Sequence, residues 1–365
     1  MTFEKAKKLL GIREDQLWLL KAALFTATEA LPFWNRWKLH WKLESIPNEA
    51  INYAIFSHVD DESRRILPLV YRNLEQTQDA LLPALREAYR NTWMRNQKLL
   101  HRAQQVVSAC NEAGIPNMLL KGIPMSLHYY NDMGVRPMGD IDVLVPWQKV
   151  EQAILVLKKF GNQPDPVEYK YRQLIHAMHC FDEGGVDVDL HWQAFFFQYY
   201  TEECVLEKPQ FRQPLALSAD NHSFILSDSY QLFHTIIHGT IGGIPTIRWI
   251  PDAYTILKRS NSIDFEAIFS YAKEKNVDFA LYVGLKVLSE NFYVDFPLPK
   301  FFDTNLMQKL YFKLVLQRPK NSVLFGINHI TKYTIAYYVF KKYKTQQSSV
   351  WKWISQKVLF WYETK

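Results

Sequence analysis

The sequence predicts an α+β fold in which a small β-sheet core lies between two helical regions. Apolar residues recur at three- and four-residue spacing through roughly the first hundred positions, where Gly and Pro are scarce. Short apolar runs separated by glycine turns follow Gly114, and helical spacing returns after Pro209 and Pro214. Because the chain exceeds the usual size of a single core, we expect three parts: a helical N-terminal region at 1–113, an α/β core at 114–220 and a helical C-terminal region at 221–365.

Both flanking regions carry the periodicity of amphipathic helices. In the N-terminal region it covers 3–10, 14–28, 49–56, 62–75 and 81–113. Gly114 suits the C-terminal cap of the last of these helices, and Pro116 lies just beyond it. In the C-terminal region we expect helices at 227–239, 247–257, 264–275, 279–290 and 305–316, followed by an aromatic and basic end.

The core region alternates short strands with helices. We expect a strand at 117–120, a turn at Lys121 and Gly122, a helix at 123–130, a strand from Asp140 that Pro146 ends, and a helix at 147–160. Two further apolar runs, 174–181 and 186–192, are separated by Gly184 and Gly185, which is typical of a β-hairpin.

Acidic side chains are concentrated on two of these strands. Side chains alternate between the faces of a strand, so Asp140 and Asp142 share one face. Paired carboxylates repel each other unless a cation neutralises them, which predicts a divalent-metal site. On the second arm of the hairpin Asp187, Asp189 and His191 share a face in the same way. A third carboxylate is therefore available, and by alternation alone either aspartate could supply it.

Composition and charge indicate where the protein is located and what kind of partner it favours. Three cysteines, with no Cys-x-x-Cys spacing, argue against a disulfide framework and a zinc site. The charged N-terminus lacks the pattern of a secretory signal, and no apolar run approaches the roughly 20 residues of a membrane span. We therefore expect a cytoplasmic protein. The net charge is +6, and from position 304 onward eleven Lys or Arg accompany one acidic residue, which favours an anionic partner.

Three segments together resemble the nucleotidyltransferase fold. They are Leu119-Leu-Lys-Gly122, Arg136-Pro-Met-Gly-Asp-Ile-Asp-Val-Leu-Val145 and Asp189-Leu-His-Trp192, and they look like the bacterial family of uncharacterised nucleotidyltransferases. The segments containing His234 and His238, and Arg248 and Asp252, are similar to that family's helical C-terminal half. The resemblance implies a small mixed β-sheet core and transfer of a nucleoside monophosphate from a triphosphate, expected to be ATP. The hydroxyl acceptor is unidentified, either a small molecule or a peptide or protein, and pyrophosphate is released.

The resemblance also implies roles for individual residues. Asp140, Asp142 and Asp189 would be the catalytic metal ligands, with Asp189 preferred to Asp187. Two Mg²⁺ ions, or Mn²⁺ in their place, would stabilise the entering and leaving oxygens of the transfer. Nucleotide binding is assigned to four residues: Lys121, Gly122, Arg136 and His191. Arg136 either neutralises phosphate or ties its loop to a carboxylate, and His191 could instead orient Asp189 or be structural.

Other functions are compatible with parts of the sequence. A non-catalytic nucleotide-sensing or RNA-binding module could keep the same fold, although retention of all three carboxylates argues against it. The aromatic and basic C-terminal end would suit an RNA-tailing enzyme, but a packed helical bundle with solvated lysines explains it more simply, so nucleic acid is not the favoured partner. His234 and His238, four residues apart, lack the Glu of a zinc-protease motif and are not expected to bind metal.

Overall fold

A computed structural model describes residues 3–296, apart from 48–49, 199–201, 219–220 and 243–245, together with residues 357, 359, 360 and 363. The helix expected at 305–316 lies outside the described residues, as does most of the aromatic and basic end. In the described part the chain is an α+β protein built on one mixed sheet, so the predicted fold class is confirmed.

The N-terminal region is helical, as predicted. Its helices are α1 (Phe3–Leu10), α2 (Glu14–Leu24), α3 (Ala27–His40), η1 (Leu43–Ser45), α4 (Ile51–His58), α5 (Asp61–Arg64), α6 (Leu67–Leu74) and α7 (Leu82–Glu112). The sequence analysis missed α3, which contains Pro32. Thr26 and Glu29 form a capping box at its start, and Trp34 and Trp37 are fully buried, so capping and packing outweigh the proline.

The sheet has seven strands in the order β3-β4-β5-β2-β1-β7-β6. Strands β1 and β7, and β2 and β5, are parallel, and the other neighbours are antiparallel. The predicted hairpin is present as β4 and β5. The strands are β1 (Met118–Leu120), β2 (Ile141–Leu144), β3 (Gln163–Pro164), β4 (Ala177–Phe181), β5 (Val188–His191), β6 (Arg212–Ser218) and β7 (Asn221–Leu226).

Between the strands lie short helices: α8 (Gly122–Pro124), the π-helical η3 (Met125–Tyr130), η4 (Trp147–Lys149), α9 (Val150–Lys158), α10 (Pro166–Lys170), η5 (Arg172–Leu174), η6 (Val205–Glu207) and η7 (Pro209–Phe211). The helices after the sheet are α11 (Asp228–Ile241), α12 (Trp249–Arg259), α13 (Phe265–Glu274) and α14 (Asp278–Phe292). Strand β7 occupies 221–226, after the predicted end of the core at 220. The division into three domains stays a prediction.

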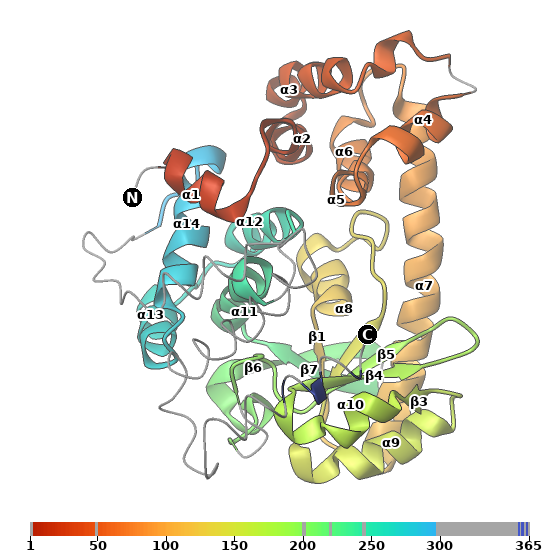
Figure 1. Cartoon of the computed structure of the whole chain (residues 1–365), viewed down its shortest axis with the longest axis vertical. Coiled ribbons are helices and arrows are strands. Elements are labelled where there is room, and N and C mark those ends of the chain that lie inside the picture. The colour runs from red at the N-terminus through yellow and green to blue at the C-terminus, as the bar shows by residue number, and fades with distance from the viewer. Residues whose placement is uncertain are drawn as a thin grey trace.

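Two apolar cores hold the sheet in place. On one face Ile141, Val143 and Val145 pack with α7 and α9. The second core joins the N-terminal helices to α11, α12 and α14, and it includes Leu120 and Leu144 from the sheet. In Figure 1 the long helix α7 runs beside α5 and α6 and continues down to the sheet, while α11, α12 and α14 lie on the other side of α8. Because side chains alternate along a strand, Asp140 and Asp142 lie on the opposite face of β2, away from the core formed with α7 and α9.

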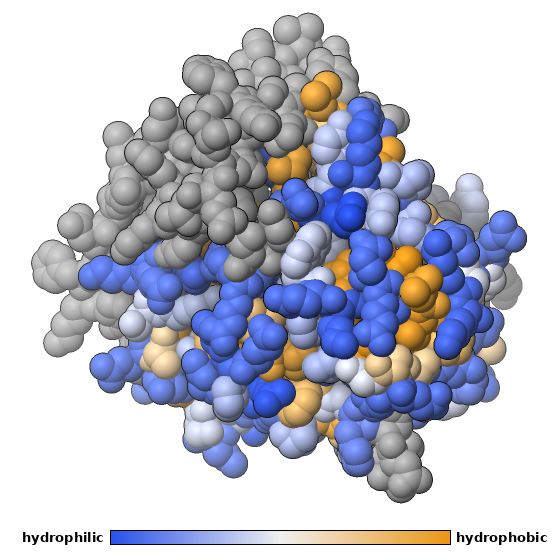
Figure 2. Space-filling view, turned by 90° about the horizontal axis from the view of Figure 1, so that it is seen from below, coloured by the Kyte–Doolittle hydropathy of each residue, from blue (hydrophilic) through white to orange (hydrophobic). Residues whose placement is uncertain are grey.

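The molecular face seen in Figure 2 is mostly hydrophilic, with apolar side chains in small groups among polar ones. Such scattered apolar residues are ordinary on a protein surface. In the part of the chain that the structure describes, no helix combines the length and apolarity needed to cross a membrane.

Helices α11 and α12 pack so closely that they need a glycine between them. A Cβ atom at Gly239 would overlap the side chain of Trp249. We expect Gly239→Ala to lower the free energy of unfolding by roughly 1–3 kcal/mol, because the helices must separate to admit the methyl group. Urea unfolding would measure it. Gly139→Ala is the control, since nothing lies within 4 Å of a Cβ there. Equal stability of the two variants would contradict this packing argument.

Candidate active site

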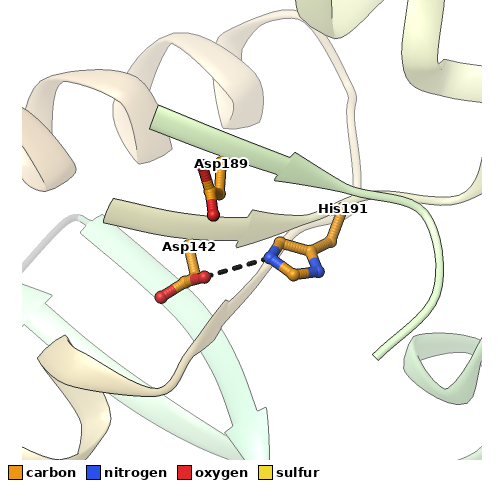
Figure 3. Close-up of side chains that lie close together, drawn as sticks. All are labelled: Asp142, Asp189 and His191. Carbon is orange, nitrogen blue, oxygen red and sulfur yellow. Dashed lines mark hydrogen bonds and ion pairs between the residues drawn. The ribbon is translucent and has the colours of Figure 1, made fainter. Parts of the chain in front are cut away.

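Three strands bring the candidate residues to one end of the sheet. Strand β1 ends at Leu120, which pairs with Asp142 of the antiparallel strand β2. Asp142 pairs in turn with Asp189 of the parallel strand β5. Ligand atoms of Asp142, Asp189 and His191 lie within 4.8 Å of one another, and all three residues are buried. Figure 3 shows the side chain of His191 meeting that of Asp142 on the neighbouring strand, with Asp189, from the same strand as His191, beside them.

Asp142 is the centre of this cluster. Its Oδ1 lies 2.6 Å from Nζ of Lys121 and 3.0 Å from Nε2 of His191. A carboxylate only accepts hydrogen bonds, so Nε2 of His191 is the protonated nitrogen. Burial alone would raise the pKa of Asp142, but the charge of Lys121 and the His191 hydrogen bond outweigh burial and hold this pKa well below its usual range. Asp142 is therefore an anion at neutral pH.

Asp189 has the opposite electrostatic character. Burial, together with the negative charge of Asp142, raises the pKa of Asp189 to about 6. Its Oδ1 lies 3.2 Å from Nε2 of His179, which is ion-pair distance, yet this buried oxygen accepts no hydrogen bond from the described part of the chain. A buried carboxylate oxygen without a donor is costly, and a bound cation would satisfy it.

His179 is a neighbour that the sequence analysis did not single out. It pairs with Asp189 across the β4–β5 ladder. Its Nδ1 lies 3.2 Å from both carboxylate oxygens of Glu168, and its backbone N–H donates to the same carboxylate at 2.6 Å. The Glu168 hydrogen bond is the main reason that the pKa of His179 is raised to about 9. The signal available in the sequence was the hairpin register, which sets His179 opposite Asp189.

Asp140 lies at the entry to β2, outside the cluster of three. It is partly exposed, and burial and the charge of Asp142 raise its pKa. Asp187 lies in the hairpin turn, where it accepts the backbone N–H of Asp182 at 3.0 Å. Of the two candidates for the third carboxylate, Asp189 is thus the one beside Asp142. The catalytic and metal roles of Asp140, Asp142 and Asp189 stay predictions.

Lys121 and Gly122 form the turn between β1 and α8. Lys121 has φ 49° and ψ −105°. Residues other than glycine rarely adopt this backbone conformation, which costs on the order of 1–3 kcal/mol. Burial would lower the pKa of Lys121, but the charge of Asp142 raises it, so the ammonium stays charged. A Cβ at Gly122 would lie 2.5 Å from Sδ of Met138, so glycine here lets the Met138 side chain of the loop before β2 pack directly against the turn.

Arg136 is buried and tied to helix α12. Its Nε lies 3.0 Å from both oxygens of Asp252, and Nη2 lies 3.0 Å from Oδ2. Of the two roles left open for Arg136, the tie between its loop and a carboxylate is the one present here. For His191, one suggested role was to orient Asp189. In the structure its hydrogen bond goes to Asp142 instead.

Further histidines surround Lys121 and Asp142. The rings of His176 and His191 are 5.6 Å apart, and those of His234 and His238 are 5.7 Å apart. Burial lowers the pKa of His176, His234 and His238, with the charge of Lys121 adding to the effect, and His234 falls to about 3. These rings are neutral at neutral pH. In the described residues His234 and His238 join no group of three metal-ligating side chains.

Comparison with known proteins identifies the family. The family described as uncharacterised nucleotidyltransferase matches residues 62–293. The chain belongs to this family. The match covers the whole sheet, the cluster around Asp142 and the helices α11 to α14. The expected family is therefore confirmed. A search of the curated proteins finds no match.

A nucleotidyltransferase acts on a nucleoside triphosphate, and enzymes of this kind generally use divalent metals. The residues present fit such an ion. Asp142 and Asp189 stand in register on adjacent strands, and Oδ1 of Asp189 has no hydrogen-bond donor in the described part of the chain. Carboxylate oxygens are the ligands that hard divalent cations prefer. In the present structure Lys121 supplies positive charge beside Asp142, and His191 donates a hydrogen bond to the same oxygen.

The raised pKa of Asp189 predicts a pH-dependent stability. A carboxyl group whose pKa is raised by folding stabilises the protein at low pH, and this contribution is lost as the pH rises through about 6. In chelator, we expect Asp189→Asn to be more stable than wild type by about 1–3 kcal/mol at pH 8, with no such advantage at pH 4. Urea unfolding at both pH values measures it. A pH-independent difference would contradict the burial argument.

Proposed function

We propose that this chain is a divalent-metal-dependent nucleotidyltransferase that moves a nucleoside monophosphate from ATP to a hydroxyl acceptor and releases pyrophosphate. The observation that carries the proposal is the register of Asp142 with Asp189 on parallel neighbouring strands, which gathers their carboxylates into one buried cluster. Membership of a nucleotidyltransferase family supports the reaction class.

In this proposal Asp142 and Asp189, with Asp140 at the entry to β2, hold the metal. Two Mg²⁺ or Mn²⁺ ions bound there would neutralise the carboxylates and stabilise charge on the entering and leaving oxygens. Lys121 is the natural partner for the triphosphate, because its ammonium is already held beside Asp142 at 2.6 Å. Gly122 lets the following helix start close to the loop before β2, and His191 keeps the Asp142 carboxylate in one orientation.

The transfer itself is an in-line displacement at the α-phosphorus. The acceptor oxygen forms a bond to phosphorus, the bond from phosphorus to the bridging oxygen breaks, and pyrophosphate leaves with that electron pair. The hydroxyl proton passes to the carboxylate of Asp189, which lies in the cluster beside Asp142. His179, held by Glu168, restrains Asp189 from the other side.

Incubation with α-labelled ATP and a native extract tests the proposal. Wild type is expected to form a labelled product in the presence of Mg²⁺, whereas Asp189→Asn forms at least about 100-fold less, since it lacks the carboxylate beside the attacking oxygen. Asp187→Asn, which removes a carboxylate from the same hairpin but outside the cluster, is the matched control and should retain activity. If tight ATP binding were found with no labelled product and no pyrophosphate, a nucleotide-sensing role would replace the catalytic one.

A further inference from the structure

A basic groove runs beside α7 and ends next to the strand that carries Asp140 and Asp142. It consists of two adjoining cavities of about 290 and 320 Å³ that share Asn91 and Arg95 in their walls. The inner cavity is bordered by Arg65 of the N-terminal region and by the loop ending at Gly139. The outer one continues past Lys98 to the β4–β5 turn at 184–185. The larger cavity is at the lower end of the size range of protein ligand sites, and the smaller one lies just below it.

The groove carries positive charge that is not neutralised by ion pairs in the described part of the chain. Arg65, Arg95 and Lys98 are exposed, and no Asp or Glu lines either cavity. In the described part of the chain none of these three cations lies within ion-pair distance of a carboxylate. Arg248 adds to the charge behind the inner cavity, where it donates to the carbonyl of Pro137 at 2.9 Å. Concave surfaces of one charge sign concentrate ligands of the opposite sign.

The position of the groove connects it to the candidate active site. Nη2 of Arg95 donates to the carbonyl of Gly139 at 3.3 Å, and the next residue is Asp140. The other end borders the hairpin whose second strand carries Asp189. The groove therefore borders the segments that lead into β2 and β5 from the α7 side of the sheet, and the starting ends of these strands separate it from the carboxylates, which lie on the other face.

The lining favours one chemical class of ligand. Apolar side chains, among them Met94, Leu99, Val186 and Met138, alternate with the cationic groups. No aromatic side chain lines either cavity, so the groove lacks the stacking surface that single-stranded nucleic acids use. Arginine clusters with apolar contacts are typical of sites for acidic peptide motifs.

We infer that this groove binds an acidic polypeptide segment, and that the bound chain continues around the starting ends of β2 and β5 to the carboxylate cluster, where its hydroxyl side chain is the acceptor. Calling the segment an acceptor rests on the proposed function; the binding site itself does not. The inference selects one of the acceptor classes that the sequence left open, and it disfavours polycationic acceptors, which the groove would repel.

Fluorescence anisotropy with the full-length protein tests the inference. The probe is a labelled ten-residue peptide of Glu residues with one central Ser, at low salt and without nucleotide. Wild type is expected to bind it, and the charge reversals Arg95→Glu and Lys98→Glu should each weaken binding at least about tenfold. Arg90→Glu, the same change on the same helix but outside both cavities, is the matched control and should stay within about twofold. Circular dichroism verifies that each variant is folded.

Two outcomes would overturn the inference. One is equal loss of affinity in Arg90→Glu and Lys98→Glu, which would mean that binding reflects net charge. The other is tighter, Lys98-dependent binding of a ten-nucleotide RNA, which would assign the groove to nucleic acid. Because the assay contains no nucleotide, peptide binding with no labelled product from ATP would remove only the proposed function. Labelled product from ATP, with no groove-dependent peptide binding, would remove only this inference.

Discussion

Replacing Asp142 with asparagine is expected to lower the rate of nucleotide transfer by a factor on the order of 10³ or more. Asp142 pairs with Asp189 across the parallel strands and has the lowest pKa of the three candidate carboxylates, because Lys121 and His191 both contact its Oδ1. The variant keeps the size of the side chain but loses the charge on which cation binding depends. Formation of labelled product from α-labelled ATP measures the effect.

Stability must be separated from catalysis in this variant. Asp142→Asn leaves the ammonium of Lys121 without its ion-pair partner, so thermal unfolding is measured alongside activity. The double variant Lys121→Met/Asp142→Asn removes that unpaired charge, and it should regain stability without regaining activity. Transfer within tenfold of wild type in Asp142→Asn would contradict the catalytic role of this carboxylate.

Replacing Asp252 with alanine is expected to lower the free energy of unfolding by roughly 3–5 kcal/mol, because a buried arginine is left without its counter-ion. Asp252 accepts three contacts at 3.0 Å or less from Arg136 and one from the hydroxyl of Tyr130 at 3.0 Å. These contacts join the loop before β2 to α12. Urea unfolding followed by fluorescence measures the loss.

A double-mutant cycle shows whether the pair acts as a unit. Arg136→Leu/Asp252→Leu removes both charges and should be less destabilised than the sum of the two single variants, since no unpaired charge remains. Strict additivity of the single effects would contradict the account of a buried, mutually dependent pair. Loss of the pair should also reduce nucleotide transfer, because the loop that it holds leads into Asp140.

The parts of the fold that follow local periodicity were predictable. The spacing Asp140-Ile-Asp142 requires both carboxylates on one face of a strand, and Gly184 and Gly185 mark the hairpin that brings Asp189 alongside. The sequence analysis missed strands β6 and β7, and Pro214 interrupts the apolar run of β6. The proline is tolerated because β6 is the last strand of the sheet, where backbone donors need no partner on the outer side.

The details of the candidate site depend on contacts that sequence spacing cannot specify. Arg136 and its partner Asp252 are separated by 116 positions, so no local pattern predicts that the arginine ties its loop to this carboxylate. The contact between Lys121 and Asp142 depends on an unusual backbone conformation at a non-glycine residue, for which no sequence signal exists. His179 can be recognised as a neighbour of Asp189 only when the register of β4 against β5 is known.

Anomalous diffraction from a crystal containing Mn²⁺ and a non-hydrolysable ATP analogue tests the central claim most directly. The account predicts Mn²⁺ within coordination distance of the carboxylates of both Asp142 and Asp189, with Lys121 displaced from Asp142 toward the phosphates. Bound nucleotide with Mn²⁺ ligated elsewhere, or with the contact between Lys121 and Asp142 intact and no ion at these carboxylates, would contradict it.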